Sequence, residues 1–205
     1  MTKDTTLFLG QWLRSPGTVG AVAPSSRRLA ETVTTPVPQR GDPVIVELGP
    51  GTGAFTAEIQ RRLNGRGHHL AVEINPALAS FLSERHPKVD VVVGDAARLP
   101  EMLRERGLEK ADAVISGLPW AAFSADTQTR LLDAVVATMS PHTAFTTFAY
   151  SFAKRMRPAQ RFRRRLHETF EEVVVGRTVW GNLPPAFVYH VRRPRSLDTA
   201  GACDL

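Results

Sequence analysis

The chain has 205 residues, 42% of them apolar, a formal net charge of +6 and one cysteine, Cys203. This length accommodates one domain with a sizeable core, and no apolar run reaches the ~18 residues that a transmembrane helix requires. A single cysteine excludes an intramolecular disulfide, and no Cys/His spacing predicts a metal site. We therefore expect no metal. The N-terminus lacks the pattern of a secretion signal, and with the single cysteine this indicates a cytoplasmic protein.

The chain divides at a Pro/Gly-rich break over residues 34–43. Residues 1–33 contain two helix-like pieces, residues 34–195 alternate between strand and helix patterns, and residues 196–205 predict a flexible tail. The predicted strands cover residues 44–47, 69–73, 89–93, 113–116, 144–150, 172–177 and 187–191. The predicted helices of the domain cover residues 54–63, 76–85, 99–106 and 127–139.

Short apolar strands that alternate with helices are typical of a doubly wound parallel sheet with both faces covered. Seven strands are predicted, and a Pro-rich connection without a helix joins the last two. We therefore expect an α/β domain with a Rossmann-like, seven-stranded sheet that ends in an antiparallel hairpin at one edge.

A glycine-rich loop, "VELGPGTG" at residues 46–53, follows the first predicted strand and opens the first helix of the domain. Glycines at such a turn let the backbone approach a ligand closely, and a helix N-terminus can hold a negative group. We expect this loop to bind a cofactor through Glu47, Gly49, Gly51, Thr52 and Gly53.

Two further acids end the next two predicted strands, at the edge where such sheets bind ligands. Glu73 lies where a ribose-binding acid belongs in a dinucleotide-type fold, and Asp95 could accept from an adenine amino group. Their neighbours Ile74 and Ala96 belong to the same predicted site. Each acid alone could be a helix cap or a surface charge. An NAD-dependent enzyme is the alternative for the set, but its glycines usually follow a Gly-x-Gly-x-x-Gly spacing.

The three segments "VELGPGTG", "AVEINP" and "VVVGDAARLP" together resemble the cofactor-binding series of class I methyltransferases. The resemblance covers residues 44–100. It implies a Rossmann-like methyltransferase that binds S-adenosylmethionine and releases S-adenosylhomocysteine.

The fourth predicted strand ends in "SGLPW", which resembles the Asn-Leu-Pro-Tyr type motif of ribosomal RNA adenine dimethyltransferases. The chain departs from that motif, because Gly117 replaces the asparagine and Trp120 the tyrosine. "SGLPW", with "GAVAPSSRRLA" and "GNLPPAFVYHVRR", is instead similar to bacterial phospholipid N-methyltransferases. That resemblance spans roughly residues 7–193 and implies stepwise N-methylation of phosphatidylethanolamine towards phosphatidylcholine.

By this resemblance, the acceptor pocket contains Gly117, Pro119, Trp120 and Tyr189, with Tyr150 as a further candidate. Methyl transfer passes positive charge from sulfur to nitrogen, and aromatic faces attract such cations. Two alternatives stay open. Trp120 could pack against the sheet edge, and Tyr189 could be a core residue because its strand alternates in polarity.

The N-terminal segment is expected to meet a membrane and to cover the site. Residues 7–13 crowd Leu, Phe and Trp side chains between basic margins, which predicts a helix in a membrane interface; a helix packed on the domain is the alternative. In the similar family, the region around residues 18–30 closes over the cofactor. Ser25 or Ser26 could cap the next helix, or Ser25 could help to hold a phosphate.

A basic cluster lies between residues 154 and 165, and its members are Lys154, Arg155, Arg157, Arg161, Arg163, Arg164 and Arg165. Such a charge attracts anionic partners, either nucleic acid or acidic lipid headgroups, and a solvated helix face is the alternative. We expect an anionic phospholipid surface as the partner, peripheral attachment to the inner face of the cell membrane, and contact between Arg155 and the substrate.

Two other functions stay open. An RNA adenine N6-methyltransferase could grip phosphates with the arginines. The missing asparagine at Gly117 argues against it, as does the lack of an added RNA-binding C-terminal domain, so we expect no nucleic acid partner. A binding module that kept the fold and lost catalysis is the third function, and the intact glycine loop argues against it.

Overall fold

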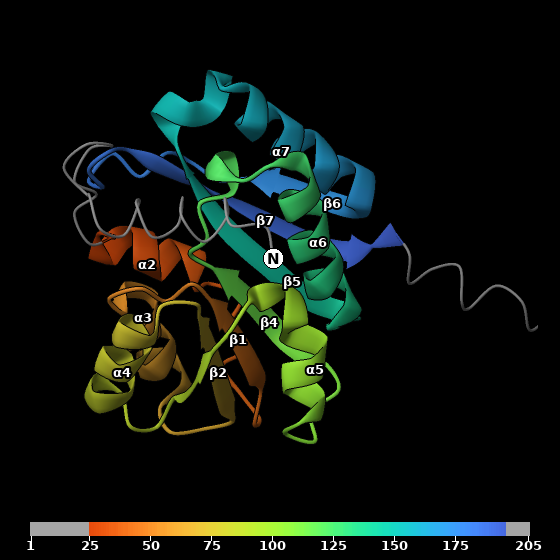
Figure 1. The fold of residues 1–205 in the computed structure, drawn as a ribbon. Helices are drawn as coiled ribbons and strands as arrows, with labels where there is room; N and C mark the ends of the chain where they lie inside the picture. Colours follow the sequence, from red (N-terminus) through yellow and green to blue (C-terminus); the bar gives the residue numbers. More distant parts are fainter. Residues whose placement is uncertain (1–24, 196–205) are drawn as a thin grey trace, which may run out of the picture.

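A seven-stranded sheet forms the centre of the computed structural model, which describes residues 25–195 (Figure 1). The strand order is β3-β2-β1-β4-β5-β7-β6. Strands β1 to β5 pair in parallel, whereas β7 runs antiparallel to both β5 and β6. The strands are β1 (Val44–Leu48), β2 (His68–Glu73), β3 (Asp90–Val93), β4 (Ala111–Ser116), β5 (Met139–Tyr150), β6 (Phe170–Val175) and β7 (Ala186–Pro194).

Helices cover both faces of the sheet (Figure 1). One face carries α2 (Arg27–Val33), α3 (Ala54–Leu63) and α4 (Pro76–Arg85). The other carries α5 (Leu99–Arg104), α6 (Ala125–Ala137) and α7 (Arg157–Thr169). Short 3-10 helices occur at η1 (Ala96–Arg98), η2 (Trp120–Ala122) and η3 (Ser151–Arg155). Within residues 25–195, no helix is long and apolar enough to cross a membrane.

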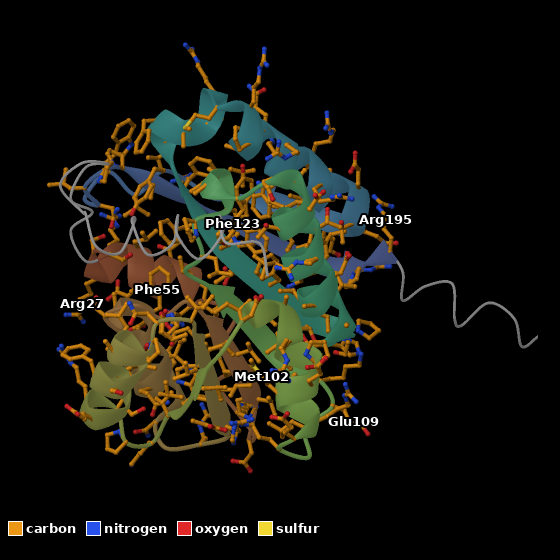
Figure 2. The ribbon with its side chains drawn as sticks, viewed as in Figure 1. Arg27, Phe55, Met102, Glu109, Phe123 and Arg195 are labelled. Atoms are coloured by element: carbon orange, nitrogen blue, oxygen red, sulfur yellow. The ribbon has the colours of Figure 1, made fainter. Side chains whose placement is uncertain are left out.

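The core is split by the sheet into two layers. In β1, Ile45 packs with α2 and α3, whereas its neighbour Val46 packs with the side of α5, α6 and α7. Phe55 of α3 and Met102 of α5 belong to the two opposite layers (Figure 2). Because both faces are covered, side chains on both faces of β1 and β4 are buried, and most of them are apolar.

The predicted architecture is confirmed, including the antiparallel hairpin at one edge, formed by β6 and β7. The bounds of α3 and α4 agree with the predicted helices 54–63 and 76–85. Helix α7 was not among the predicted helices. Its buried residues Phe162 and Leu166 lie four positions apart on one face and charged side chains occupy much of the rest, so the helix is amphipathic, although its sequence was interpreted only as a basic cluster.

The N-terminal and C-terminal predictions are covered only in part. Helix α2 is one of the two helix-like pieces expected before the Pro/Gly-rich break. The predicted interfacial segment 7–13 and the tail 196–205 lie outside the described residues. The division of the chain at residues 33 and 195 therefore stays a prediction.

Candidate functional site

The glycine loop turns from the end of β1 into α3. Gly49, Gly51 and Gly53 have φ values of +66°, +57° and +88°, a left-handed region that glycine adopts without steric cost. The loop is closed by a hydrogen bond from the Gly53 N–H to the Pro50 carbonyl, at 3.0 Å. A Cβ added at Gly51 would meet no atom within 4 Å, so open space lies beside the loop where a ligand could approach the backbone.

Glu73 joins the end of β2 to this loop. Its Oε2 accepts from the Gly51 N–H at 3.1 Å, and its Oε1 accepts from the Asn75 N–H at 2.9 Å. Burial raises the pKa of the Glu73 carboxyl above its ordinary value, and these backbone hydrogen bonds oppose the rise only in part. Each oxygen keeps a further lone pair. The carboxylate therefore holds the loop and can still accept ribose hydroxyls.

Glu47 lies beneath the loop, on the face of the sheet that α3 covers. Its Oε2 accepts from the Thr56 hydroxyl at 2.8 Å and lies 3.1 Å from His69 Nε2 without hydrogen-bond geometry. Its Oε1 is buried and has no hydrogen-bond partner among residues 25–195. An orphaned buried oxygen is costly in a protein interior. This oxygen and the open space beside Gly51 fit a bound nucleotide-like cofactor.

Asp95 follows β3 at the same edge of the sheet. Its Oδ1 accepts from the Ala97 N–H at 3.0 Å, which caps η1, and its Oδ2 lies 3.5 Å from Arg130 Nη2. Asp95 is thus a helix cap, which was the alternative interpretation of this acid, and its contact with adenine stays a prediction. Ile74 follows Glu73 directly and is half-buried, and Ala96 is buried in the core at the start of η1.

Next to this edge, an apolar cavity of about 280 Å³ opens between η2, η3 and the ends of β5 and β7. All five residues predicted for the acceptor pocket line it, and they are Gly117, Pro119, Trp120, Tyr150 and Tyr189. Gly117 lies where β4 ends beside the glycine loop. The cavity therefore adjoins the predicted cofactor position.

Trp120 is a core residue that borders this cavity. Its side chain is almost fully buried, its indole Nε1–H donates to the Ser116 hydroxyl at 3.1 Å, and its ring stacks on Phe162 of α7. These contacts agree with the alternative interpretation of Trp120 as a packing residue. Trp120 also lines the cavity, and a contact of its ring with the substrate stays a prediction.

The two tyrosines of the cavity are neutral phenols. Burial raises the pKa of Tyr150 to about 12, and it also raises the pKa of Tyr189. A phenol with a raised pKa keeps its proton at neutral pH, so neither side chain is a ready proton acceptor. Tyr189 is nearly fully buried, as the core alternative expected, yet it lines the cavity.

Several lining residues were not identified from the sequence. They are aromatic or flexible apolar side chains, namely Phe148, Phe152, Met156, Phe162 and Phe187. Two of them could have been found by spacing, because Phe148 and Phe187 lie two positions before Tyr150 and Tyr189 in their strands. Residues two apart share one face of a strand. Phe152 belongs to η3, Phe162 belongs to α7, and Met156 is the cap residue between these two elements, which were not predicted from the sequence.

A basic groove of about 660 Å³ adjoins the apolar cavity. It contains the predicted substrate contact Arg155, together with Lys154, Arg163, Arg164 and His167. Tyr189 and Lys154 line both the groove and the cavity. A positively charged surface thus lies directly beside an apolar one.

The basic cluster does not act as one surface. Arg161 donates from Nε to Gln128 Oε1 at 3.2 Å and from Nη2 to the Phe123 carbonyl at 3.1 Å. Arg165 donates to the Thr129 hydroxyl. These two arginines tie α7 to α6 and the end of η2. The remaining charges are exposed and can meet an anionic partner.

Ser26 is the N-cap of α2, because its hydroxyl accepts from the Leu29 N–H at 3.2 Å. One of the two predictions for the serine pair is thereby confirmed. Ser25 lies just before this cap and is half-buried, and its contact with a phosphate stays a prediction.

The sheet order, the glycine loop and the acids at the strand ends define a Rossmann-like domain that binds a nucleotide cofactor. Residues 45–142 match a family model described as "Methyltransferase domain". Over 193 residues, the chain is 35% identical to an ornithine lipid N-methyltransferase from Singulisphaera acidiphila, covering 93% of this chain and 96% of that protein. The chain belongs to the class I S-adenosylmethionine-dependent methyltransferases.

Two further proteins are more distantly similar to this chain. A ribosomal RNA small subunit methyltransferase A from Synechococcus sp. is 36% identical over 96 residues, which are 45% of this chain and 31% of that protein. The O-methyltransferase from Bacillus cereus, solved in complex with S-adenosylhomocysteine, has the same fold, with a TM-score of 0.66 and 16% identity. That match covers 91% of this chain and 90% of the solved one. The match to the methyltransferase family model and to the lipid N-methyltransferase confirms the expected cofactor, S-adenosylmethionine.

Proposed function

We propose that this enzyme transfers methyl groups from S-adenosylmethionine to the amine of a membrane lipid at the cytoplasmic face of the membrane. Phosphatidylethanolamine is the substrate expected from the sequence. An ornithine lipid is the second candidate, because the relative from Singulisphaera acidiphila carries that name. Both lipids present an amine near an anionic group and an apolar body.

The observation that carries the proposal is the apolar cavity beside Gly117, which adjoins a basic groove. An amphiphilic lipid fits this pair of surfaces, with its anionic group towards Lys154 and Arg155 and its apolar part towards the aromatic cavity. Tyr189 lies at the junction of the two. Gly117, which follows β4 at the cofactor-binding edge, lines the same cavity as Tyr189, so a lipid amine inside this cavity can reach that edge.

The cavity residues suit a transfer that moves positive charge. When bound, the cofactor supplies a methyl group on a positively charged sulfur. The amine must arrive neutral and in line, and the positive charge then passes to nitrogen. Aromatic rings at the cavity, among them Trp120, Tyr150 and Tyr189, can stabilise such a cation by ~0.5–2 kcal/mol each. Both tyrosines hold their protons, so neither is assigned as the acceptor of the proton that the amine loses.

The RNA alternative has support from the similarity to ribosomal RNA methyltransferases, but the structure around Gly117 disfavours it. The Gly117 N–H donates to the Leu48 carbonyl at 2.7 Å, and a Cβ at Gly117 would lie 2.5 Å from the Gly49 carbonyl oxygen. Real Cβ atoms essentially never approach so closely. An asparagine at this position, as in the RNA dimethyltransferase motif, would require both loops to move.

The test is a labelling experiment with purified full-length protein and methyl-labelled S-adenosylmethionine. Vesicles with phosphatidylethanolamine, vesicles with an ornithine lipid, and unmodified ribosomal RNA are offered in separate reactions. Label in either lipid supports the proposal and identifies the substrate. Label in RNA alone overturns it. Tight cofactor binding with no label in any acceptor overturns it in favour of a module without catalysis.

A further inference from the structure

Four large apolar side chains are exposed on two segments, the η3 region that lines the apolar cavity and the connection between β6 and β7. Phe152 is 66% exposed, Met156 47%, Trp180 77% and Leu183 73%. They account for half of the eight exposed large hydrophobic residues among residues 25–195. We call these four residues the apolar rim. Exposed apolar side chains that gather in one place mark an interaction surface.

The rim comes from two segments that are distant in the sequence and adjacent in the fold. Phe152 and Met156 belong to η3 and its C-cap, and the other two belong to the connection between β6 and β7. The Ser151 N–H donates to the Pro185 carbonyl at 2.8 Å, which fastens the start of η3 to that connection. Both segments lie on the same side of the molecule, beyond the end of β5 (Figure 1).

The rim is bordered by positive charge. Lys154, Arg155 and Arg157 are exposed on the same turn and at the start of α7. Nitrogen-tipped side chains project away from this region at the top of the view (Figure 2). Phe152 also stacks on Tyr150, with ring centroids 5.7 Å apart, so the rim is continuous with the cavity wall.

We propose that the apolar rim inserts into the interface of an anionic bilayer and opens the cavity directly to the lipid layer. The inference rests on the proposed function, because it assigns the surface by which that site meets its substrate. Tryptophan and phenylalanine favour the interfacial region of a bilayer, and flanking cations favour anionic headgroups. A lipid amine then reaches the cavity without leaving the membrane.

Charge complementarity selects a bilayer over a second copy of the chain. Two copies that met through this surface would bring Lys154, Arg155 and Arg157 of each against their equivalents, and like charges at an interface oppose association. An anionic bilayer instead supplies the opposite charge next to an apolar layer.

The test is binding of the full chain to vesicles of phosphatidylcholine and phosphatidylglycerol in equal amounts, without an amine lipid. Trp180→Ser/Leu183→Ser removes two rim residues that do not line the cavity. We expect at least a tenfold loss of vesicle affinity, since the variant lacks two apolar side chains that the bilayer would bury. Phe81→Ser/Val174→Ser removes two exposed apolar residues elsewhere and serves as the matched control. Its vesicle affinity should equal that of the wild type.

A second readout reports insertion itself. In a Trp12→Phe background, which removes the tryptophan of the predicted interfacial segment, bromine-labelled lipids should quench the remaining tryptophan fluorescence, and Trp180→Phe should remove most of that quenching. Cofactor affinity, measured by calorimetry, should be unchanged in Trp180→Ser/Leu183→Ser. Equal vesicle affinity of this variant and the wild type would overturn the inference. It would also be overturned if the wild type were a dimer in solution and this variant a monomer. Because the vesicles lack a methyl acceptor, failure of the proposed function would be seen only in the labelling experiment.

Discussion

The main-chain N–H of Ser26 donates to Asn182 Oδ1 at 2.8 Å, although the two residues are 156 positions apart. Asn182 is buried, and its Nδ2 donates in turn to the Pro184 carbonyl at 2.7 Å. This one amide therefore joins the start of α2 to the connection between β6 and β7. The Ser26 end of the predicted lid, the region around residues 18–30, is thus fastened to the segment that carries half of the apolar rim.

Replacing Asn182 should destabilise the protein. Asn182→Ala leaves the Ser26 N–H and the Pro184 carbonyl without this partner, and each loss costs about 1–3 kcal/mol when the group stays buried. Urea unfolding of the purified protein measures the free energy of unfolding. Gln160→Ala removes an exposed amide on α7 and should change it little. Equal stability of the two variants would show that the Ser26–Asn182 link does not contribute to the free energy of unfolding.

Removing the carboxylate of Glu73 should weaken cofactor binding. Glu73→Ala takes away the acceptor of the Gly51 N–H and the predicted acceptor of the ribose hydroxyls. A hydrogen bond to a charged group contributes ~1.5–3 kcal/mol, so affinity should fall at least about tenfold. Calorimetry with S-adenosylhomocysteine measures the change, and Glu84→Ala on the exposed side of α4 is the control. Unchanged affinity in a folded Glu73→Ala protein contradicts the assignment.

The affinity for the cofactor should also depend on pH through Glu73. The ionised form is the one that accepts hydroxyl hydrogens, so affinity is full above the pKa and falls as the pH drops through it. Burial raises this pKa above its ordinary 4.5, and the loss should therefore start at a higher pH than for an exposed glutamate. Calorimetry from neutral to acid pH measures this, with circular dichroism to check folding. A Glu73→Gln variant with the same pH profile would assign the dependence elsewhere.

Trp120 should matter more for turnover than for cofactor binding. Trp120→Ala deletes a core ring stacked on Phe162 and should cost ~3–5 kcal/mol of stability, so it tests folding more than catalysis. Trp120→Phe is the informative change, because it keeps an aromatic face at the cavity. Steady-state kinetics should give a lower kcat with cofactor affinity preserved. If kcat stays at the wild-type value, Trp120 is a packing residue alone.

The arginines of the basic cluster should separate into two groups. Arg155→Gln/Arg157→Gln removes exposed charge, each worth about 1 kcal/mol near an anionic surface, and should weaken vesicle binding and its salt dependence. Arg161→Gln should instead lower the free energy of unfolding, because its hydrogen bonds to Gln128 and Phe123 hold α7 on α6. Vesicle sedimentation across a salt series and urea unfolding distinguish the two effects. Identical behaviour of the two variants would contradict this division.

The sequence predicted the parts of the fold that have clear local signals. Helix α3 ends at the left-handed Asn64, and α4 begins at the Asn75 cap followed by Pro76, so both helices were predicted with correct bounds. Helix α7 has Pro158 in its first turn but no capping side chain, so the signal for its start is weaker. Its arginines are partly engaged in packing, as Arg161 shows, and sequence alone does not distinguish packed from exposed arginines.

In the functional site, too, only the parts with clear local signals were predicted from the sequence. The glycine loop and Glu73 were predictable because strand, loop and helix follow one another directly. The cavity brings together Gly117, Tyr150 and Tyr189 from three separate segments, and only the resemblance to a known family connected them. The apolar rim needs Phe152 beside the β6–β7 connection, and the sheet order that brings these segments together was not evident from the sequence.

The most direct measurement for the account is the lipid composition of a bacterium that lacks methylated lipids and expresses this enzyme. Mass spectrometry of the lipid extract should show amine lipids that carry one or more added methyl groups, with the Glu73→Ala variant giving none. The lipid that gains the methyl groups identifies the substrate. An unchanged lipid profile, with wild-type protein folded and new N6-methyladenine in the ribosomal RNA, would contradict the account.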